Sequence, residues 1–166
     1  MTIDVIPVRA LKDNYIWMIV DVTESRALIV DPGDATPAME FLEQHQLKPA
    51  AILLTHHHWD HTNGVEELQQ RYQIPVYGSA AEKISNVTNP LKHDDQFIVR
   101  NFPLQLQVIG IPGHTLGHIA FYTKDLLFSG DTLFAAGCGR LFEGTAKQLF
   151  TSLQSMTALP DDTNVY

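Results

Sequence analysis

Short apolar runs of strand length dominate the first third of the chain. Residues 3–8 (I-D-V-I-P-V), 15–22 (Y-I-W-M-I-V-D-V) and 27–32 (A-L-I-V-D-P) are rich in β-branched and aromatic residues, which favours strands. The polar segment T-E-S-R between the second and third runs predicts a hairpin turn. Residues 50–54 (A-A-I-L-L) are apolar throughout, which is typical of a strand that is buried on both faces.

Helical spacing predicts three helices. The first has Thr36 as its N-cap, the second begins near Asn63 or Gly64, and the third runs from about residue 146 to 156 with Thr145 as its N-cap. An apolar stripe along a helix is expected to face a core. The residues at helical spacing are, in chain order, Met39, Leu42 and Gln46; Val65, Leu68 and Tyr72; and Leu149, Phe150, Leu153 and Met156.

Three further strands are expected at residues 104–111, 118–122 and 125–129. Strands that are covered by helices imply a layered α/β arrangement. The chain shows no low-complexity segment, charge run or linker, so we expect one domain over residues 1–166.

Composition narrows the class of protein. The formal net charge of -8 argues against a nucleic-acid partner, whose phosphates would require a basic surface. The single cysteine, Cys138, permits no internal disulfide, and we interpret it as a packing residue. The N-terminal segment carries charges within its apolar stretch, so it does not resemble a signal peptide, and no apolar run approaches the ~20 residues of a membrane span. We therefore expect a cytoplasmic monomer that acts on a small molecule.

The segment T-H-H-H-W-D-H-T-N-G, residues 55–64, concentrates four of the eight histidines behind a buried strand. In an extended segment His56 and His58 project to the same side. Asp60 and His61 lie at the turn into the next helix and are free to point elsewhere. One short segment therefore supplies two pairs of ligands, while His57, between ligands, is expected to point away. The alternative is a solvated loop that is merely rich in histidine.

Two other buried runs also end at candidate ligands. V-I-G-I-P-G precedes His114, and L-L-F-S-G precedes Asp131. Loops at strand ends can bring distant side chains together at one sheet edge. Imidazole and carboxylate are ligands that zinc, iron and manganese accept, and metal availability often decides between these ions. For His118 we favour a structural role over a ligand role.

These motifs carry a resemblance to a known family. T-H-H-H-W-D-H matches the H-x-H-x-D-H signature of the metallo-β-lactamase superfamily, and D-P-G-D, G-H-T-L-G-H and S-G-D-T-L-F follow in that superfamily's order. The segments L-K-D-N-Y-I-W and G-D-T-L-F-A-A-G-C-G-R-L-F-E-G-T resemble the glyoxalase II (hydroxyacylglutathione hydrolase) branch. The resemblance covers essentially the whole chain.

The resemblance implies a four-layer αββα sandwich with two metal ions, most often zinc, at one sheet edge. Position by position, it implies that one metal is held by His56, His58 and His114, the other by Asp60 and His61, and both by Asp131. Asp60 and Asp131 would be the catalytic carboxylates. It further implies that Arg140 contacts glutathione, where some relatives have lysine, and that Phe142 stands where some relatives have tyrosine.

The implied activity is hydrolysis of S-D-lactoylglutathione to glutathione and D-lactate by attack of a metal-bridging hydroxide. Glyoxalase II continues past the position of Tyr166 with a histidine-containing segment and a helical domain, which the sequence lacks. We therefore expect residues 1–166 to hold metal incompletely and to turn over substrate poorly. Three alternatives remain: a metal-binding fragment with little activity, a persulfide dioxygenase with one iron, and a metallo-RNase that the acidic charge disfavours.

Overall fold

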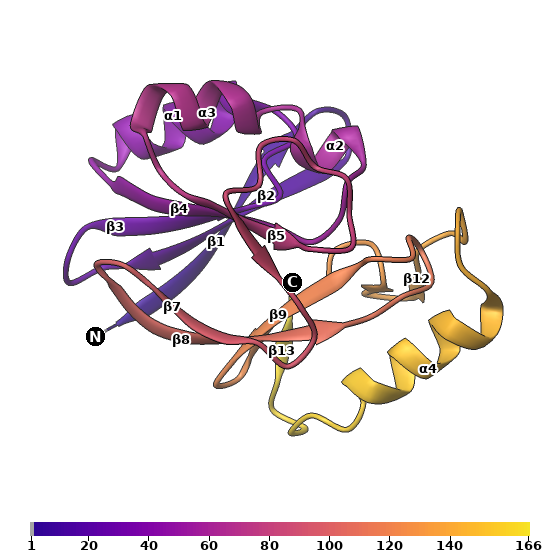
Figure 1. The fold of residues 1–166 in the computed structure, drawn as a ribbon. Coiled ribbons are helices and arrows are strands. Elements are labelled where there is room, and N and C mark those ends of the chain that lie inside the picture. The colour runs from indigo at the N-terminus through magenta and orange to yellow at the C-terminus, as the bar shows by residue number, and fades with distance from the viewer. Residues whose placement is uncertain (1) are drawn as a thin grey trace.

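Two β-sheets form the centre of the molecule, seen in the computed structural model, which describes residues 2–166 (Figure 1). The first sheet has six strands in the order β1-β2-β3-β4-β5-β6. Its first three strands pair antiparallel and the remaining pairs are parallel. The bounds are β1 Ile3–Ala10, β2 Asn14–Asp21, β3 Arg26–Val30, β4 Lys48–Leu54, β5 Val76–Ser79 and β6 Asn89–Leu91.

The second sheet has five strands in the order β13-β10-β9-β8-β7, of which only the β10–β13 pair is parallel. A separate two-stranded hairpin, β11–β12, lies between β10 and β13 in the chain. The bounds are β7 Gln96–Val99, β8 Phe102–Gly110, β9 Ile119–Thr123, β10 Leu126–Phe128, β11 Leu133–Phe134, β12 Gly137–Cys138 and β13 Asn164–Val165.

Among residues 2–166, three helices cover the sheets from outside and a fourth, short helix lies at their edge. Helices α1 (Ala35–Gln44) and α3 (Val65–Tyr72) lie over the first sheet, and α4 (Ala146–Met156) lies on the far side of the second (Figure 1). The short helix α2 (Trp59–Thr62) follows β4 at the sheet edge. Among residues 2–166, the longest of these helices is too short and too polar to cross a membrane.

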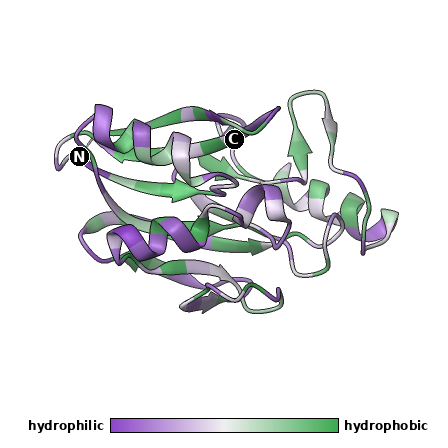
Figure 2. Ribbon diagram, turned by 90° about the horizontal axis from the view of Figure 1, so that it is seen from above, coloured by the Kyte–Doolittle hydropathy of each residue, from purple (hydrophilic) through white to green (hydrophobic). Residues whose placement is uncertain are grey.

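The alternation of side chains along β3 and β4 explains how both faces of the first sheet are buried. Ile29 and Ile52 pack beneath α1 and α3, whereas Leu28 and Leu53 point to the opposite face and pack against the second sheet. Each such side chain contributes roughly 1.5–3 kcal/mol when it is fully buried. Figure 2 shows the strands of this central region largely in green, with purple on the helices outside them.

A third apolar cluster separates the second sheet from α4. Ile111, Leu127 and Met156 form its buried part, and Leu153 packs against it. One cluster lies between α1, α3 and the first sheet, the second lies between the two sheets, and the third lies between the second sheet and α4. These four layers confirm the predicted αββα arrangement.

Most predicted segments form the expected element, but three details of the helices are wrong. The N-cap of α1 is Asp34, whose carboxylate accepts the Thr36 N–H at 2.9 Å, so the helix begins two residues earlier than expected. Gln46 lies beyond its end with a positive φ of 54°. Phe150 is 60% exposed, so it is not part of the buried stripe of α4. The N-cap Thr145 is confirmed, with Gln148 completing a capping box.

Candidate metal centre

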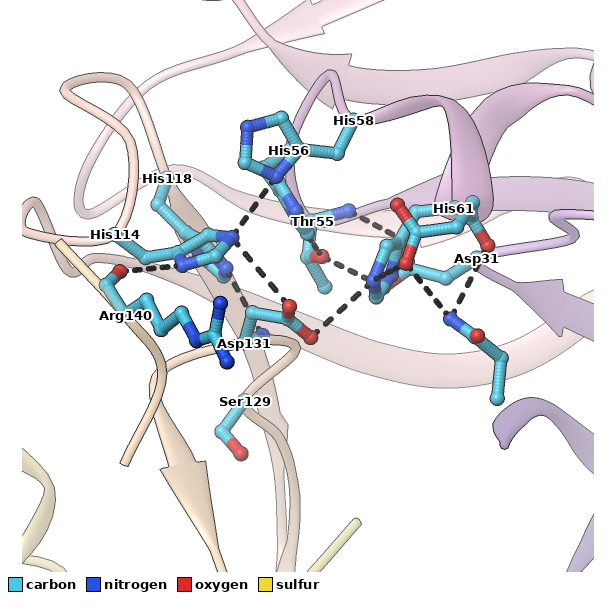
Figure 3. A network of polar contacts seen from close by, with 12 residues as sticks. Asp31, Thr55, His56, His58, His61, His114, His118, Ser129, Asp131 and Arg140 are labelled. Carbon is cyan, nitrogen blue, oxygen red and sulfur yellow. Dashed lines mark hydrogen bonds and ion pairs between the residues drawn. The ribbon is translucent and has the colours of Figure 1, made fainter. Parts of the chain in front are cut away.

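Three strand ends meet at one edge of the two sheets. His56 follows β4, His114 follows β8, and Asp131 follows β10. The side chains of all three point into the same space in Figure 3. The structure thus brings together the three positions that the sequence predicted to converge from distant segments.

One half of this space is lined by imidazoles, and we call it the imidazole side. Ligand atoms of His56, His58 and His114 all lie within 4.8 Å of one another. His114 Nε2 is 2.9 Å from His58 Nδ1. Such close, mutually facing ring nitrogens are the arrangement that a divalent cation could share.

The other half, the carboxylate side, consists of Asp31, Asp60 and His61. Ligand atoms of Asp31, His56 and His61 lie within 4.8 Å of one another, and His61 Nε2 is 3.6 Å from Asp60 Oδ2. The structure thus adds Asp31 to the residues that the sequence analysis had placed here. The D-P-G-D motif carried this residue, but its local pattern held no sign of a role in the site.

Asp131 stands between the two sides. Its Oδ1 is 3.2 Å from His61 Nε2, and its Oδ2 is 3.4 Å from His114 Nε2 (Figure 3). Each oxygen of one carboxylate therefore faces a different half of the site. A single group in this position can contact two cations at once.

Asp31 orients the loop that carries the histidines. Its carboxylate accepts the N–H of Thr55 at 2.8 Å and the hydroxyl of Thr55 at 2.6 Å, and it lies 3.0 Å from His61 Nδ1. With Nδ1 held by Asp31, Nε2 of His61 is left to face the site. When the ring nitrogen that does not bind the metal donates a hydrogen bond to a carboxylate, that bond sets the orientation and the tautomer of the histidine ligand.

Asn14 orients Asp60 across a separation of 46 residues. Its amide donates to Asp60 Oδ2 at 3.0 Å. Gly33 lies against the same residue so closely that an added Cβ would be 1.8 Å from the Asp60 carbonyl oxygen. The sequence analysis missed both residues, because only the tertiary contact gives them a role.

His114 and Asp131 are positioned by backbone groups. His114 Nδ1 donates to the Arg140 carbonyl at 2.7 Å, and the Asp131 N–H donates to His118 Nε2 at 3.2 Å. His118 also stacks on His56 at a centroid distance of 4.6 Å and is 1% exposed. These contacts agree with the predicted structural role of His118.

The two sides differ in protonation. Burial, together with the neighbouring histidines, lowers the pKa of His56 well below its usual value, and burial lowers the pKa of His118 to about 3. Burial would also lower the pKa of His61, but the carboxylates of Asp31 and Asp131 outweigh it and raise the pKa to about 10. Burial opposes ionisation of Asp131, yet the hydrogen bond from His61 and the nearby imidazoles lower its pKa.

Two buried nitrogens complete the description of the site. Among residues 2–166, His56 Nε2 is buried and lacks a hydrogen-bond partner, whereas the buried His61 Nε2 has Asp131 Oδ1 at 3.2 Å and Asp60 Oδ2 at 3.6 Å. An unpartnered buried polar atom is costly, and buried nitrogens that face a carboxylate are suited to a metal. The donor set of this site therefore fits divalent cations.

Comparison with known proteins places the chain in a family. The model described as the metallo-beta-lactamase superfamily matches residues 11–166. The chain belongs to the metallo-β-lactamase superfamily. Within this superfamily, the hydroxyacylglutathione hydrolase of Nitrosomonas europaea is 54% identical over 164 residues, covering 99% of this chain and 62% of that relative. The chain thus spans somewhat less than two thirds of the length of that curated protein.

Solved structures agree with this assignment to the superfamily. BLEG-1 B3 metallo-β-lactamase superposes with a TM-score of 0.86 at 27% identity, covering 99% of this chain and 90% of that one. TTHA1623, crystallised in a di-iron-bound form, superposes with a TM-score of 0.80 at 28% identity, covering 97% and 90%. The expected fold and the resemblance to glyoxalase II are therefore confirmed.

The site opens into a pocket of about 1120 Å³. Arg140 and Phe142 line this pocket, and the Phe142 ring lies edge-on to His58 and His114 at centroid distances of 5.1 and 5.2 Å. Cys138 also lines it and is exposed, so the interpretation of this residue as a packing residue is wrong. The pocket thus combines one guanidinium with an aromatic wall.

Proposed function

We propose that this chain acts in hydrolysis of S-(2-hydroxyacyl)glutathione thioesters, such as S-D-lactoylglutathione, to glutathione and the free 2-hydroxy acid. The observation that carries the proposal is the carboxylate of Asp131, whose two oxygens face His61 and His114 at 3.2 and 3.4 Å. The printed name of the Nitrosomonas europaea relative supports the choice of substrate.

Two divalent cations, which we propose to be zinc, would occupy the site. His56, His58 and His114 would hold one, Asp60 and His61 the other, and Asp131 both. The buried, unpartnered Nε2 of His56 and the close approach of His61 Nε2 to Asp60 and Asp131 support this, and so does the di-iron form of TTHA1623. When bound, such a pair of cations lowers the pKa of water and polarises a carbonyl, and iron or manganese fits the same donors.

The protein's own groups would position the reactants. Asp60 and Asp131 both line the pocket, where their carboxylates would accept hydrogen bonds from the attacking water and keep it between the two sides. Arg140 would bind a carboxylate of the tripeptide, because its planar guanidinium can donate two parallel hydrogen bonds. Phe142 would form an apolar wall beside the reacting carbonyl.

Metal analysis and a thioesterase assay on the same preparation test the proposal. We expect the zinc-loaded chain to hydrolyse S-D-lactoylglutathione slowly and the Asp131→Ala variant to lose this activity together with bound metal. A β-lactam serves as a control substrate, since a structural neighbour is a B3 metallo-β-lactamase. Metal binding without any thioester turnover would leave the alternative of a metal-binding chain with little activity.

A second assay addresses the oxygenase alternative. The iron-loaded chain would be mixed with glutathione persulfide and followed by oxygen uptake. We expect none, because Asp60, His61 and Asp131 provide donors for a second cation beside the first. Oxygen uptake with one iron per chain would contradict the proposed hydrolase.

A further inference from the structure

His57 is the one member of the histidine cluster that the metal centre does not use. It points away from His56 and His58, as expected, and each of its ring nitrogens faces a carboxylate. Nδ1 contacts Glu82 Oε2, and Nε2 is 3.3 Å from Glu143 Oε1. An imidazole between two carboxylates from distant loops is an unusual arrangement for a merely exposed residue. We call this group the Glu82–His57–Glu143 bridge.

Glu82 fixes the inner end of the bridge. Its side chain is only 2% exposed, and its Oε1 accepts the hydroxyl of Thr115 at 2.7 Å. Gly117 lies so close that an added Cβ would be 2.7 Å from the same oxygen. Since Thr115 directly follows His114, Glu82 holds His57 and the His114 loop together.

Glu143 forms the outer end and belongs to the segment that carries Arg140 and Phe142. We call residues 139–143 the rim loop. Glu143 Oε2 accepts the N–H of Leu116 at 2.9 Å. The N–H groups of Phe142 and Glu143 both donate to the carbonyl of His114, at 3.2 and 3.3 Å. The rim loop is therefore tied to the His114 loop through its backbone and to His57 through a side chain.

We propose that His57 is a positioning residue that holds the rim loop against the metal-binding loop, so that Arg140 and Phe142 stay in place for the substrate. The inference rests on the proposed thioester hydrolysis only for the identity of that substrate. Its physical basis is geometric: His57 lies between two metal-binding histidines in the chain, and its ring reaches the loop that lines the opposite side of the pocket. The contact between His57 Nε2 and the Glu143 carboxylate, at 3.3 Å, links the ring to the rim loop, so its loss should loosen the loop measurably.

Amide hydrogen exchange tests the bridge without any need for activity. In the zinc-loaded His57→Ala variant, the amides of Leu116, Phe142 and Glu143 should exchange about tenfold faster than in the wild type. Glu143→Ala, at a side chain 37% exposed, should produce a similar change without endangering folding. Because the two residues share one contact, the effects of the two substitutions on the exchange of the Phe142 and Glu143 amides should be less than additive in the double variant.

Steady-state kinetics test the positioning role. His57→Ala and Glu143→Ala should raise KM for the thioester about tenfold and change kcat less than about threefold, with bound metal unchanged in Glu143→Ala. Glu67→Ala is the matched control, since it removes the same charge from an exposed position on α3 and should change nothing. His57→Gln, which keeps a donor, should restore part of the affinity.

The outcomes separate this inference from the proposed function. If the wild-type chain hydrolyses no thioester, the proposed function fails while the exchange rates still decide whether the bridge holds the loop. Unchanged exchange at all three amides, or additive effects in the double variant, would overturn the bridge. An active chain whose KM is unchanged in both single variants would overturn the positioning role.

Discussion

The imidazole side and the carboxylate side share His56 and Asp131 as neighbours, yet they hold protons differently. Burial lowers the pKa of His56, so this residue offers the imidazole side a neutral nitrogen near pH 7. On the carboxylate side, Asp31 and Asp131 outweigh burial and raise the pKa of His61 to about 10. A cation can therefore bind His56 on the imidazole side directly, whereas it must displace a proton from His61 on the carboxylate side. The two sides therefore differ in the protonation of their ligands as well as in the number of ligands.

Replacing Asp131 should have the largest effect, because its carboxylate faces both sides. Asp131→Ala should weaken metal binding on each side by more than about a hundredfold. Even the loss of a group that only hydrogen-bonds to a metal ligand lowers metal affinity about 10- to 100-fold. Metal content after dialysis, with zinc measured per chain, checks this. If only one side lost its metal, Asp131 would belong to that side alone and the comparison would fail.

The dependence of metal affinity on pH should separate the two sides. His61 has a raised pKa, so it is protonated below about pH 10 and each cation bound on its side releases one proton. The affinity of the carboxylate side should then rise about tenfold per pH unit between pH 7 and 9, while that of the imidazole side stays nearly constant. Competition with a chelator at several pH values measures both affinities. Parallel slopes for the two metals would contradict the difference in protonation.

Removing Asn14 should affect the carboxylate side alone. Asn14→Ala frees the Asp60 carboxylate, which it now holds at 3.0 Å, and should weaken metal binding on that side about tenfold. Cobalt substitution followed by optical spectroscopy distinguishes the two positions. Asn63→Ala, an exposed residue at the end of α2, is the control and should leave both spectra unchanged.

Arg140→Ala should have the smallest effect on metal and should act only on substrate. The Arg140 carbonyl, which accepts from His114 at 2.7 Å, is part of the backbone and survives the substitution. We expect unchanged metal content and a KM for S-D-lactoylglutathione that rises about three- to tenfold with little change in kcat. An unchanged KM would mean that the guanidinium lies outside the substrate site.

Elements that depend on residues close together in the sequence could be predicted, whereas short or ambiguous ones could not. The N-cap Thr145 was predicted correctly because its partner, Gln148, lies three residues away. The strands β5, β6 and β7 were missed, since each has at most four residues and too little periodicity to distinguish a strand from a loop. Thr36 was mistaken for the N-cap because Asp34, two residues earlier, is an equally good capping residue.

Distance along the sequence also decided which residues of the candidate site could be predicted. His56, His58, Asp60 and His61 could be recognised as a group because they are close in sequence, and His114 and Asp131 because each follows a buried run. The contacts of Asn14 with Asp60 and of His57 with Glu143 join residues that are 46 and 86 positions apart. No local pattern reports such a pair.

The sequence by itself determined which donors are present, that they follow strands, and which helix and strand segments alternate around them, because these properties depend on residue type and on short-range periodicity. The tertiary structure alone decided that Asp131 faces both sides, that two carboxylates raise the pKa of His61 and that the Glu82 side chain is buried against His57. Those properties depend on distances between loops and on the water excluded from them. Both are set only when the two sheets pack together.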